Sequence, residues 1–189
     1  MLITRSRTAV QPEFDHALDT LSDWVRDSDS FTEVVGRWAG TPVQYVPLHQ
    51  EIRALELSDL ADADDLGMRL GTQARLRDGR LQITAWGEDV VFARVSATIA
   101  QHRLPPEVRR QLDETDLPLG AILKRNQVRR HTLKITRPDQ YTERDNPPLM
   151  QVRALLTLVG RPIAVVRETV HEKLMQHRAT DPRTELRFA

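Results

Sequence analysis

Hydrophobic positions near the N-terminus repeat at helical spacing. Between residues 12 and 26 apolar side chains recur every three or four positions, which predicts an amphipathic helix. The polar residues that follow interrupt this pattern, and either Asp29 or Ser30 is a suitable cap for a short helix over 31–38. The Gly-Thr-Pro sequence at 40–42 then ends the helical region.

Further along the chain, apolar residues cluster or alternate at every second position, as in β-strands. Strands are predicted at residues 43–46, 81–85, 90–99, 128–135, 150–159 and 162–170. Tight turns at 86–89 and at Gly160-Arg161 join two pairs of these strands, which predicts two antiparallel hairpins.

Short helical segments and one long loop separate the predicted strands. Helices are expected over 105–112, where two prolines open the first turn, and over 117–123. Residues 136–149 hold three prolines and read as a loop, whereas residues 1–10 and 176–189 are expected to fray. Helices placed between hairpins indicate an α+β fold on an antiparallel sheet.

Composition narrows the classes of protein. A length of 189 residues fits one domain, predicted to span the whole chain, and 40% hydrophobic residues suffice for a core. Lysine plus arginine number 27 and aspartate plus glutamate also number 27, so the formal net charge is zero. A balanced chain has no field to attract a polyanion, and no nucleic-acid partner is expected.

Missing residue types exclude further chemistry. The chain has no cysteine, which rules out disulfides, thiolate nucleophiles and cysteine-ligated zinc. Its histidines match no common ligand spacing, and no metal site is expected. No apolar run reaches the roughly 18 residues of a membrane span, and the N-terminus does not resemble a signal peptide. These features predict a cytoplasmic protein without a membrane partner, as a monomer or small homo-oligomer.

Glu168 is the most informative single position. In the strand over 163–170 it shares a face with Ala164, Val166 and Val170, so burial is expected to raise the pKa of its carboxyl group. Buried carboxyl groups of this kind are frequent in active sites. The alternative is a glutamate at the end of a strand that reaches solvent.

Arginines on the predicted strands are candidates for binding a carboxylate, because the planar guanidinium matches carboxylate geometry. They are Arg80, Arg94, Arg129, Arg130 and Arg153. Arg80 shares a face with Gln82 and Thr84, which is equally compatible with a solvated face. Arg94 follows Phe92 by two positions and is expected to be partly buried. The basic segment 124–130 reads as a solvated edge.

Three segments resemble the chorismate pyruvate-lyase family. They are DWVRDSDSFTEVV at 23–35, RLPPEVRRQLDETDLPLGAIL at 103–123 and VRALLTLVGRPIAVVRETV at 152–170, with TDLPLG the most specific part. With the hairpin at 80–99 the resemblance covers roughly three quarters of the chain. It implies a six-stranded antiparallel sheet with flanking helices, and flap-like segments over a buried site.

The resemblance also implies site residues. Glu168 corresponds to the family's essential glutamate and Arg80 to its carboxylate-binding arginine. Aligning Arg80 needs a one-residue shift relative to Gly87, and Arg77 is a possible substitute. Phe31 corresponds to an apolar residue that binds the product in the family, and Leu119 corresponds to a residue that contacts the product through its backbone. Arg94 matches a second arginine found in part of the family.

The implied reaction releases pyruvate from chorismate and leaves 4-hydroxybenzoate. It produces an aromatic ring and therefore needs no cofactor. Arg167, which stands before the essential glutamate, departs from the small polar residue usual in the family, so a homologue acting on another aryl or cyclohexadienyl acid remains open. The alternative from another class is a binding protein of the same fold without catalysis, as in the ligand-sensing domains of one family of transcription regulators.

Overall fold

The computed structural model describes residues 11–85, 87–138 and 145–180. The predicted fraying of 1–10 and 181–189, residue 86 of the predicted turn and 139–144 of the predicted loop lie outside the described residues. The helices are α1 (Gln11–Arg26), α2 (Phe31–Ala39), α3 (Leu60–Leu66), α4 (Pro106–Glu114), α5 (Leu119–Leu123) and α6 (Glu172–Thr180). The strands are β1 (Gln44–Ala54), β2 (Gln73–Ala85), β3 (Glu88–Ile99), β4 (Arg129–Thr136), β5 (Pro148–Leu158) and β6 (Arg161–His171).

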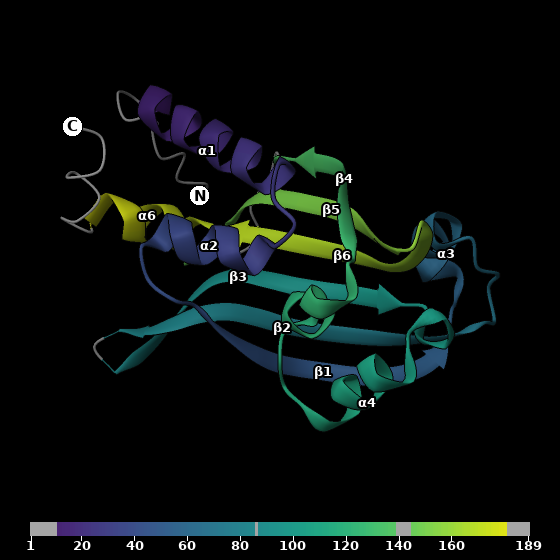
Figure 1. Cartoon of the computed structure of the whole chain (residues 1–189). Helices are drawn as coiled ribbons and strands as arrows, with labels where there is room; N and C mark the ends of the chain where they lie inside the picture. The colour runs from purple at the N-terminus through teal and green to yellow at the C-terminus, as the bar shows by residue number, and fades with distance from the viewer. Residues whose placement is uncertain (1–10, 86, 139–144, 181–189) are drawn as a thin grey trace, which may run out of the picture.

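The strands form one six-stranded sheet in the order β1-β2-β3-β6-β5-β4, and every neighbouring pair is antiparallel (Figure 1). The C-terminal strand β6 therefore lies in the middle of the sheet, beside β3. The predicted α+β class and the six-stranded antiparallel sheet are confirmed. Because β6 has a strand on each side, its backbone groups are bonded in both directions, and most of its side chains are buried.

Helices cover the two faces of the sheet unequally. On one face α1, α2 and α6 pack over a hydrophobic cluster that includes Leu81, Val152 and Val170, and α4 and α5 pack over a neighbouring cluster around Ala97 and Val166. On the other face α3 covers only one end of the strands, over a third cluster. We call these the covered face and the open face; Figure 1 shows α1, α2, α4 and α6 on the same side of the sheet.

Local signals explain the predicted elements that are present. Ser30 caps α2, its Oγ accepting a hydrogen bond from the backbone N–H of Glu33 at 3.3 Å. Gly40 ends α2 in the left-handed region, with φ of 70°. Val159 and Gly160 both have positive φ, so the β5–β6 hairpin closes through the two-residue turn whose twist matches its strands.

The structure adds elements that the pattern did not predict. Strand β1 continues to Ala54, α3 follows it, and β2 begins at Gln73 instead of residue 81. Most of β1 is exposed because it is an edge strand, so it has no buried alternating face. Helix α6 continues to Thr180, within the segment from residue 176 that is expected to fray, and Leu174 and Met175 of this helix pack into the covered-face core.

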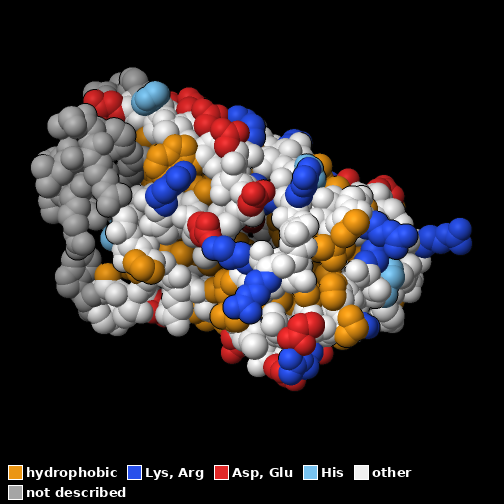
Figure 2. All heavy atoms as spheres, in the orientation of Figure 1, with side chains coloured by type: hydrophobic (Ala, Val, Ile, Leu, Met, Phe, Trp, Pro, Cys, Tyr) orange, Lys and Arg blue, Asp and Glu red, His pale blue; other side chains and the backbone are white. Residues whose placement is uncertain are grey.

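The described helices include none that is long and apolar enough to cross a membrane. Figure 2 shows acidic and basic side chains mixed over the covered side of the molecule, in keeping with the formal net charge of zero.

Candidate functional site

A narrow pocket lies between the covered face of the sheet and the first residues of α2 and α5. Its volume is about 80 Å³. The sheet contributes three charged side chains, those of Glu168, Arg130 and Arg77, and Tyr45 closes one side. Phe31 and Leu119 come from the covering helices. The pocket thus combines apolar walls with a few convergent charged groups, which is the usual composition of a small-molecule site.

Glu168 lies in the centre of the sheet on the covered face. Its register partners are Val95 of β3 and Val152 of β5, so an aliphatic side chain flanks it on each neighbouring strand. Only 6% of the residue is exposed, which confirms its predicted burial and excludes the alternative in which it reaches solvent. Burial raises the pKa of the Glu168 carboxyl group to about 7, although the neighbouring Arg130 guanidinium acts in the opposite direction.

Arg130 is the partner of Glu168. It is one of the strand arginines that the sequence offers as a carboxylate binder, but no site role was assigned to it. Its Nη2 donates to Oε2 of Glu168 at 2.6 Å, and its side chain is 3% exposed. Its Nη1 donates to the carbonyl oxygen of Val25 at 2.9 Å and to Oγ1 of Thr132 at 2.8 Å. The interpretation of segment 124–130 as a solvated edge is therefore wrong for Arg130. Alternation along β4, which places Arg130 and Thr132 on one face, is the signal that would have found it.

Arg77 is the second buried cation of the pocket. Only 4% of the residue is exposed, and its guanidinium carbon lies 5.6 Å from the centre of the Tyr45 ring. Its Nη1 has no hydrogen-bond partner among the described residues. A buried charged donor that lacks a partner is costly, so this N–H is available to an anionic ligand.

Arg80 does not share this pocket, contrary to the expectation from the resemblance. The register places Glu168 in one cross-strand row with Val95 and Gly79. Side chains alternate between the two faces of a strand. Arg80 follows Gly79 by one residue and therefore points to the open face. Arg77 precedes Gly79 by two residues and therefore points to the covered face, as Glu168 does. On the open face Nη2 of Arg80 lies 3.3 Å from Oδ2 of Asp89.

Arg94 also lies on the open face. It is the register partner of Arg80 and is exposed, so the expectation that it is partly buried with Phe92 is wrong. The physical reason is a β-bulge. Residues 81 and 82 of β2 pair with residues 93 and 91 of β3, which leaves Phe92 as an extra residue and breaks the alternation.

Phe31 and Leu119 do lie beside Glu168 in the pocket. Phe31 is the first residue of α2 and is 4% exposed, and Leu119 is the first residue of α5 and is half-buried. Of the predicted site residues, the structure therefore brings Glu168, Phe31 and Leu119 together in one pocket. Arg77 lies there in place of Arg80, and Arg94 lies outside the pocket.

Gly79 makes room for the Tyr45 ring beside the pocket. A Cβ built at Gly79 would stand 2.3 Å from Cε2 and 2.6 Å from the hydroxyl oxygen of Tyr45, closer than real contacts allow. Gly79→Ala is therefore expected to displace the ring and destabilise the fold by about 1–3 kcal/mol, as overpacking does. Urea unfolding of this variant would measure the loss. Gly79→Ala with Tyr45→Leu is the matched control and should recover most of it; no recovery would contradict the assignment.

The described residues include no group of three or more His, Asp or Glu side chains placed to hold a metal ion. The charged residues that line the pocket are two arginines, Arg77 and Arg130, and two acids, Glu168 and Asp29. The guanidinium groups suit a small organic anion.

The fold defines the class: an α+β domain of the chorismate lyase-like fold, with a small pocket on the covered face. The ligand-binding domain of a putative GntR-family transcriptional regulator from Bordetella bronchiseptica has a similar structure, with a TM-score of 0.50 and 13% identity over 68% of this chain and 85% of that one. The effector domain of PhnF from Mycobacterium smegmatis gives 0.52 and 13%, over 76% of this chain and 89% of that one. At such low identity these similarities establish the fold alone. No protein-family model and no curated protein matches the sequence.

Proposed function

We propose that this chain is a cofactor-independent chorismate pyruvate-lyase that acts in the pocket on the covered face. One observation carries the proposal: Arg77, a buried arginine whose Nη1 has no partner among the described residues, shares a pocket with a buried glutamate whose pKa is near neutrality. The sequence resemblance supports the choice of substrate. Arg77 takes the role of carboxylate anchor that the resemblance gave to Arg80.

The reaction asks little covalent chemistry of the protein. The ring C–O bond to the enolpyruvyl group breaks, and the neighbouring ring carbon, which bears the hydroxyl group, loses its proton. The electron pair of that C–H bond completes the aromatic ring of 4-hydroxybenzoate. The departing enolpyruvate takes up a proton on its methylene carbon and becomes pyruvate. The protein therefore needs to orient the dianion, exclude water and accept one proton.

The pocket residues fit these tasks. Arg77 binds the ring carboxylate, and the carboxylate of Glu168 accepts a hydrogen bond from the ring hydroxyl and takes the proton from the same carbon. Its pKa of about 7 makes it both substantially ionised and basic enough to accept a proton at neutral pH. Phe31 and Leu119 supply apolar contacts to the ring and exclude water.

Entry of the substrate requires movement of the covering segments. The volume of about 80 Å³ is well below the roughly 300–1,000 Å³ of typical ligand sites. The segments nearest the pocket are the first turn of α2 and the five-residue helix α5. We assign to them the role of flaps that open to admit chorismate and close over it.

The direct test is to incubate the purified protein with chorismate and to measure 4-hydroxybenzoate and pyruvate. Both products should appear in equal amounts. Arg77→Ala should weaken 4-hydroxybenzoate binding by about 10–100-fold, because a charge-assisted hydrogen bond is lost. Arg110→Ala, at an exposed position on α4, is the control and should bind normally. Failure to form either product would overturn the lyase proposal.

A second candidate function is binding without turnover. The observation that favours it is the similarity to ligand-binding and effector domains of GntR-family regulators. The two functions separate in the same experiment. If 4-hydroxybenzoate binds and Arg77→Ala abolishes its binding while chorismate stays intact, the pocket belongs to a binding protein.

A further inference from the structure

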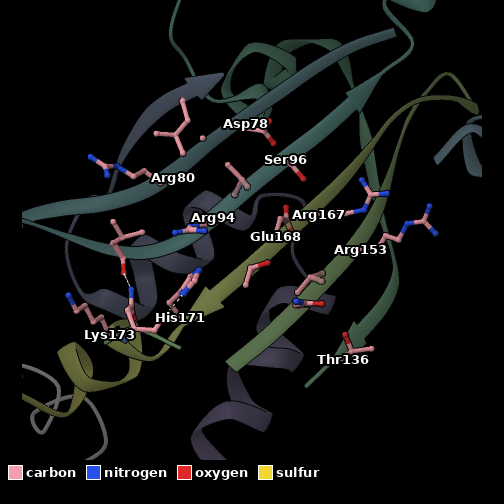
Figure 3. Close-up of a pocket in the computed structure, with 18 of the residues that line it drawn as sticks. Asp78, Arg80, Arg94, Ser96, Thr136, Arg153, Arg167, Glu168, His171 and Lys173 are labelled. Atoms are coloured by element: carbon pink, nitrogen blue, oxygen red, sulfur yellow. Dashed lines mark hydrogen bonds between the residues drawn. The ribbon is translucent and has the colours of Figure 1, made fainter. Parts of the chain in front are cut away.

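The open face of the sheet carries a second hollow that the proposed lyase chemistry does not use. Its volume is about 810 Å³, and we call it the open-face trough. Figure 3 shows it from within, with Arg80 and Arg94 on β2 and β3 and with Arg167 and Arg153 on β6 and β5. Six of the described residues that line it are arginine or lysine: Arg80, Arg94, Lys134, Arg153, Arg167 and Lys173.

The trough places like charges directly opposite one another on neighbouring strands. Arg80 is the register partner of Arg94, and Arg153 is the register partner of both Arg167 and Lys134. Like charges at directly opposed positions destabilise a sheet. An arrangement that lowers the stability of the folded protein and recurs at two places in one hollow indicates a function that needs the charge.

Acidic neighbours pair with three of these cations. Asp89 lies 3.3 Å from Arg80, and Asp65 lies 3.0 Å from Arg153. Asp62 of α3 accepts hydrogen bonds from Arg153 at 2.9 Å and from Arg167 at 2.6 Å, and so fixes both guanidinium groups. The Nε atoms of Arg80 and Arg153 are buried and have no hydrogen-bond partner among the described residues. Two orphaned N–H donors at separate positions of one hollow point to acceptor groups that a ligand would supply.

We propose that the open-face trough binds a small molecule with two oxyanion groups, phosphate or carboxylate. Guanidinium groups fixed by acidic neighbours are preorganised for such groups, which they bind through paired hydrogen bonds. One anionic group would lie between Arg80 and Arg94 and the other beside Arg153 and Arg167. The two anion positions lie on the open face, whereas Val95, Ser96 and Glu168 line both this trough and the covered pocket.

A nucleic-acid strand is a poorer occupant. Proteins that bind single strands stack the bases on aromatic side chains, and no aromatic ring other than the imidazole of His171 is found among the described residues that line the trough. The formal net charge of zero also removes the broad positive field that a polyanion would follow.

Calorimetric titration of the whole chain with inorganic pyrophosphate and, separately, with citrate tests the proposal. Binding of either at one site per chain, weakened by added salt, is expected, and the tighter of the two identifies the anionic group. Arg94→Gln should weaken this binding by about tenfold. Thr169→Asp, which adds a negative charge to the trough beside its register partner Arg94, is an independent second variant and should weaken it too.

Two controls locate the site. Arg77→Ala, in the covered pocket, and Arg110→Ala, on α4, should bind both anions as the unmodified protein does. Three results would each overturn the proposal: no binding of either anion, loss of binding in Arg77→Ala, or tighter binding of a single-stranded oligonucleotide than of pyrophosphate at the same ionic strength.

Discussion

Glu168→Gln is expected to lower kcat for chorismate by about 10²–10⁴-fold, the contribution typical of a positioned acid or base. Glutamine keeps the shape of the side chain and can still accept the hydrogen bond from Arg130, but it cannot take up a proton. In the unmodified protein kcat/KM should rise with pH through about 7, as Glu168 becomes ionised. Steady-state rates across this pH range, with circular dichroism to confirm folding, provide the measurement.

Ionisation of Glu168 affects the rate and the stability of the fold in opposite directions: as pH rises, kcat/KM increases and the free energy of unfolding decreases. The pKa of Glu168 is 4.5 in an ordinary environment and about 7 in the folded chain. Between these values the folded state binds more protons than the unfolded state, so the free energy of unfolding falls as pH rises through this range. Glu168→Gln should remove this part of the pH dependence. An unchanged rate in Glu168→Gln, or a pH profile that is the same in both proteins, would count against the mechanism.

Arg130→Leu is expected to destabilise the fold by about 3–5 kcal/mol above pH 7, the cost of leaving one member of a buried ion pair alone. The variant leaves the Glu168 carboxylate without its cation and removes the donor to the carbonyl oxygen of Val25. Urea unfolding at about pH 8 measures the effect, because Glu168, with a pKa of about 7 beside Arg130, is then ionised in the unmodified protein.

Two further variants make this expectation specific. Arg130→Leu combined with Glu168→Leu should recover much of the stability, since an apolar pair of similar volume often replaces a buried ion pair without loss. Lys124→Ala breaks the exposed pair with Glu33 and should change stability little. If Arg130→Leu alone unfolds at the same urea concentration as the unmodified chain, the ion pair is not a stabilising contact.

Sequence patterns predicted the strands and helices in which one face is apolar and buried and the other is polar and exposed. The hairpin of β5 and β6 combines alternating aliphatic residues with a Gly turn, and its pattern correctly placed Glu168 on a buried face. Helix α2 was found because Ser30 and Gly40 mark its ends. In these segments local propensity and burial favour the same structure.

Strand β2 shows why the rest was missed. Its first half interleaves buried arginines with other residues: Arg75 pairs with Asp113 of α4, and Arg77 faces the pocket. A hydrophobic pattern reads such positions as solvated, because a buried charge depends on a partner that is distant in sequence. Helix α3 was missed for a related reason. Its buried residue Asp62 forms ion pairs with Arg153 of β5 and Arg167 of β6, which are distant in sequence.

The choice between Arg77 and Arg80 depends on register, which a single sequence does not specify. A shift of one residue moves a side chain to the other face of the sheet. The bulges after Pro47 in β1 and at Phe92 in β3 change the alternation on both sides of β2. Only the pairing of Gly79 with Val95, and of Val95 with Glu168, determines which arginine accompanies the glutamate.

One guanidinium joins the middle of the sheet to the connection between the first two helices. Arg130 donates from one nitrogen to Glu168 and from the other to the carbonyl oxygen of Val25, at the end of α1. The acidity of Glu168 and the position of this connection are consequently linked, and the linkage is reciprocal. A ligand that draws the carboxylate away from Arg130 loosens the α1–α2 corner. An outward movement of that corner, which takes Arg130 away from Glu168, raises the pKa of the Glu168 carboxyl group.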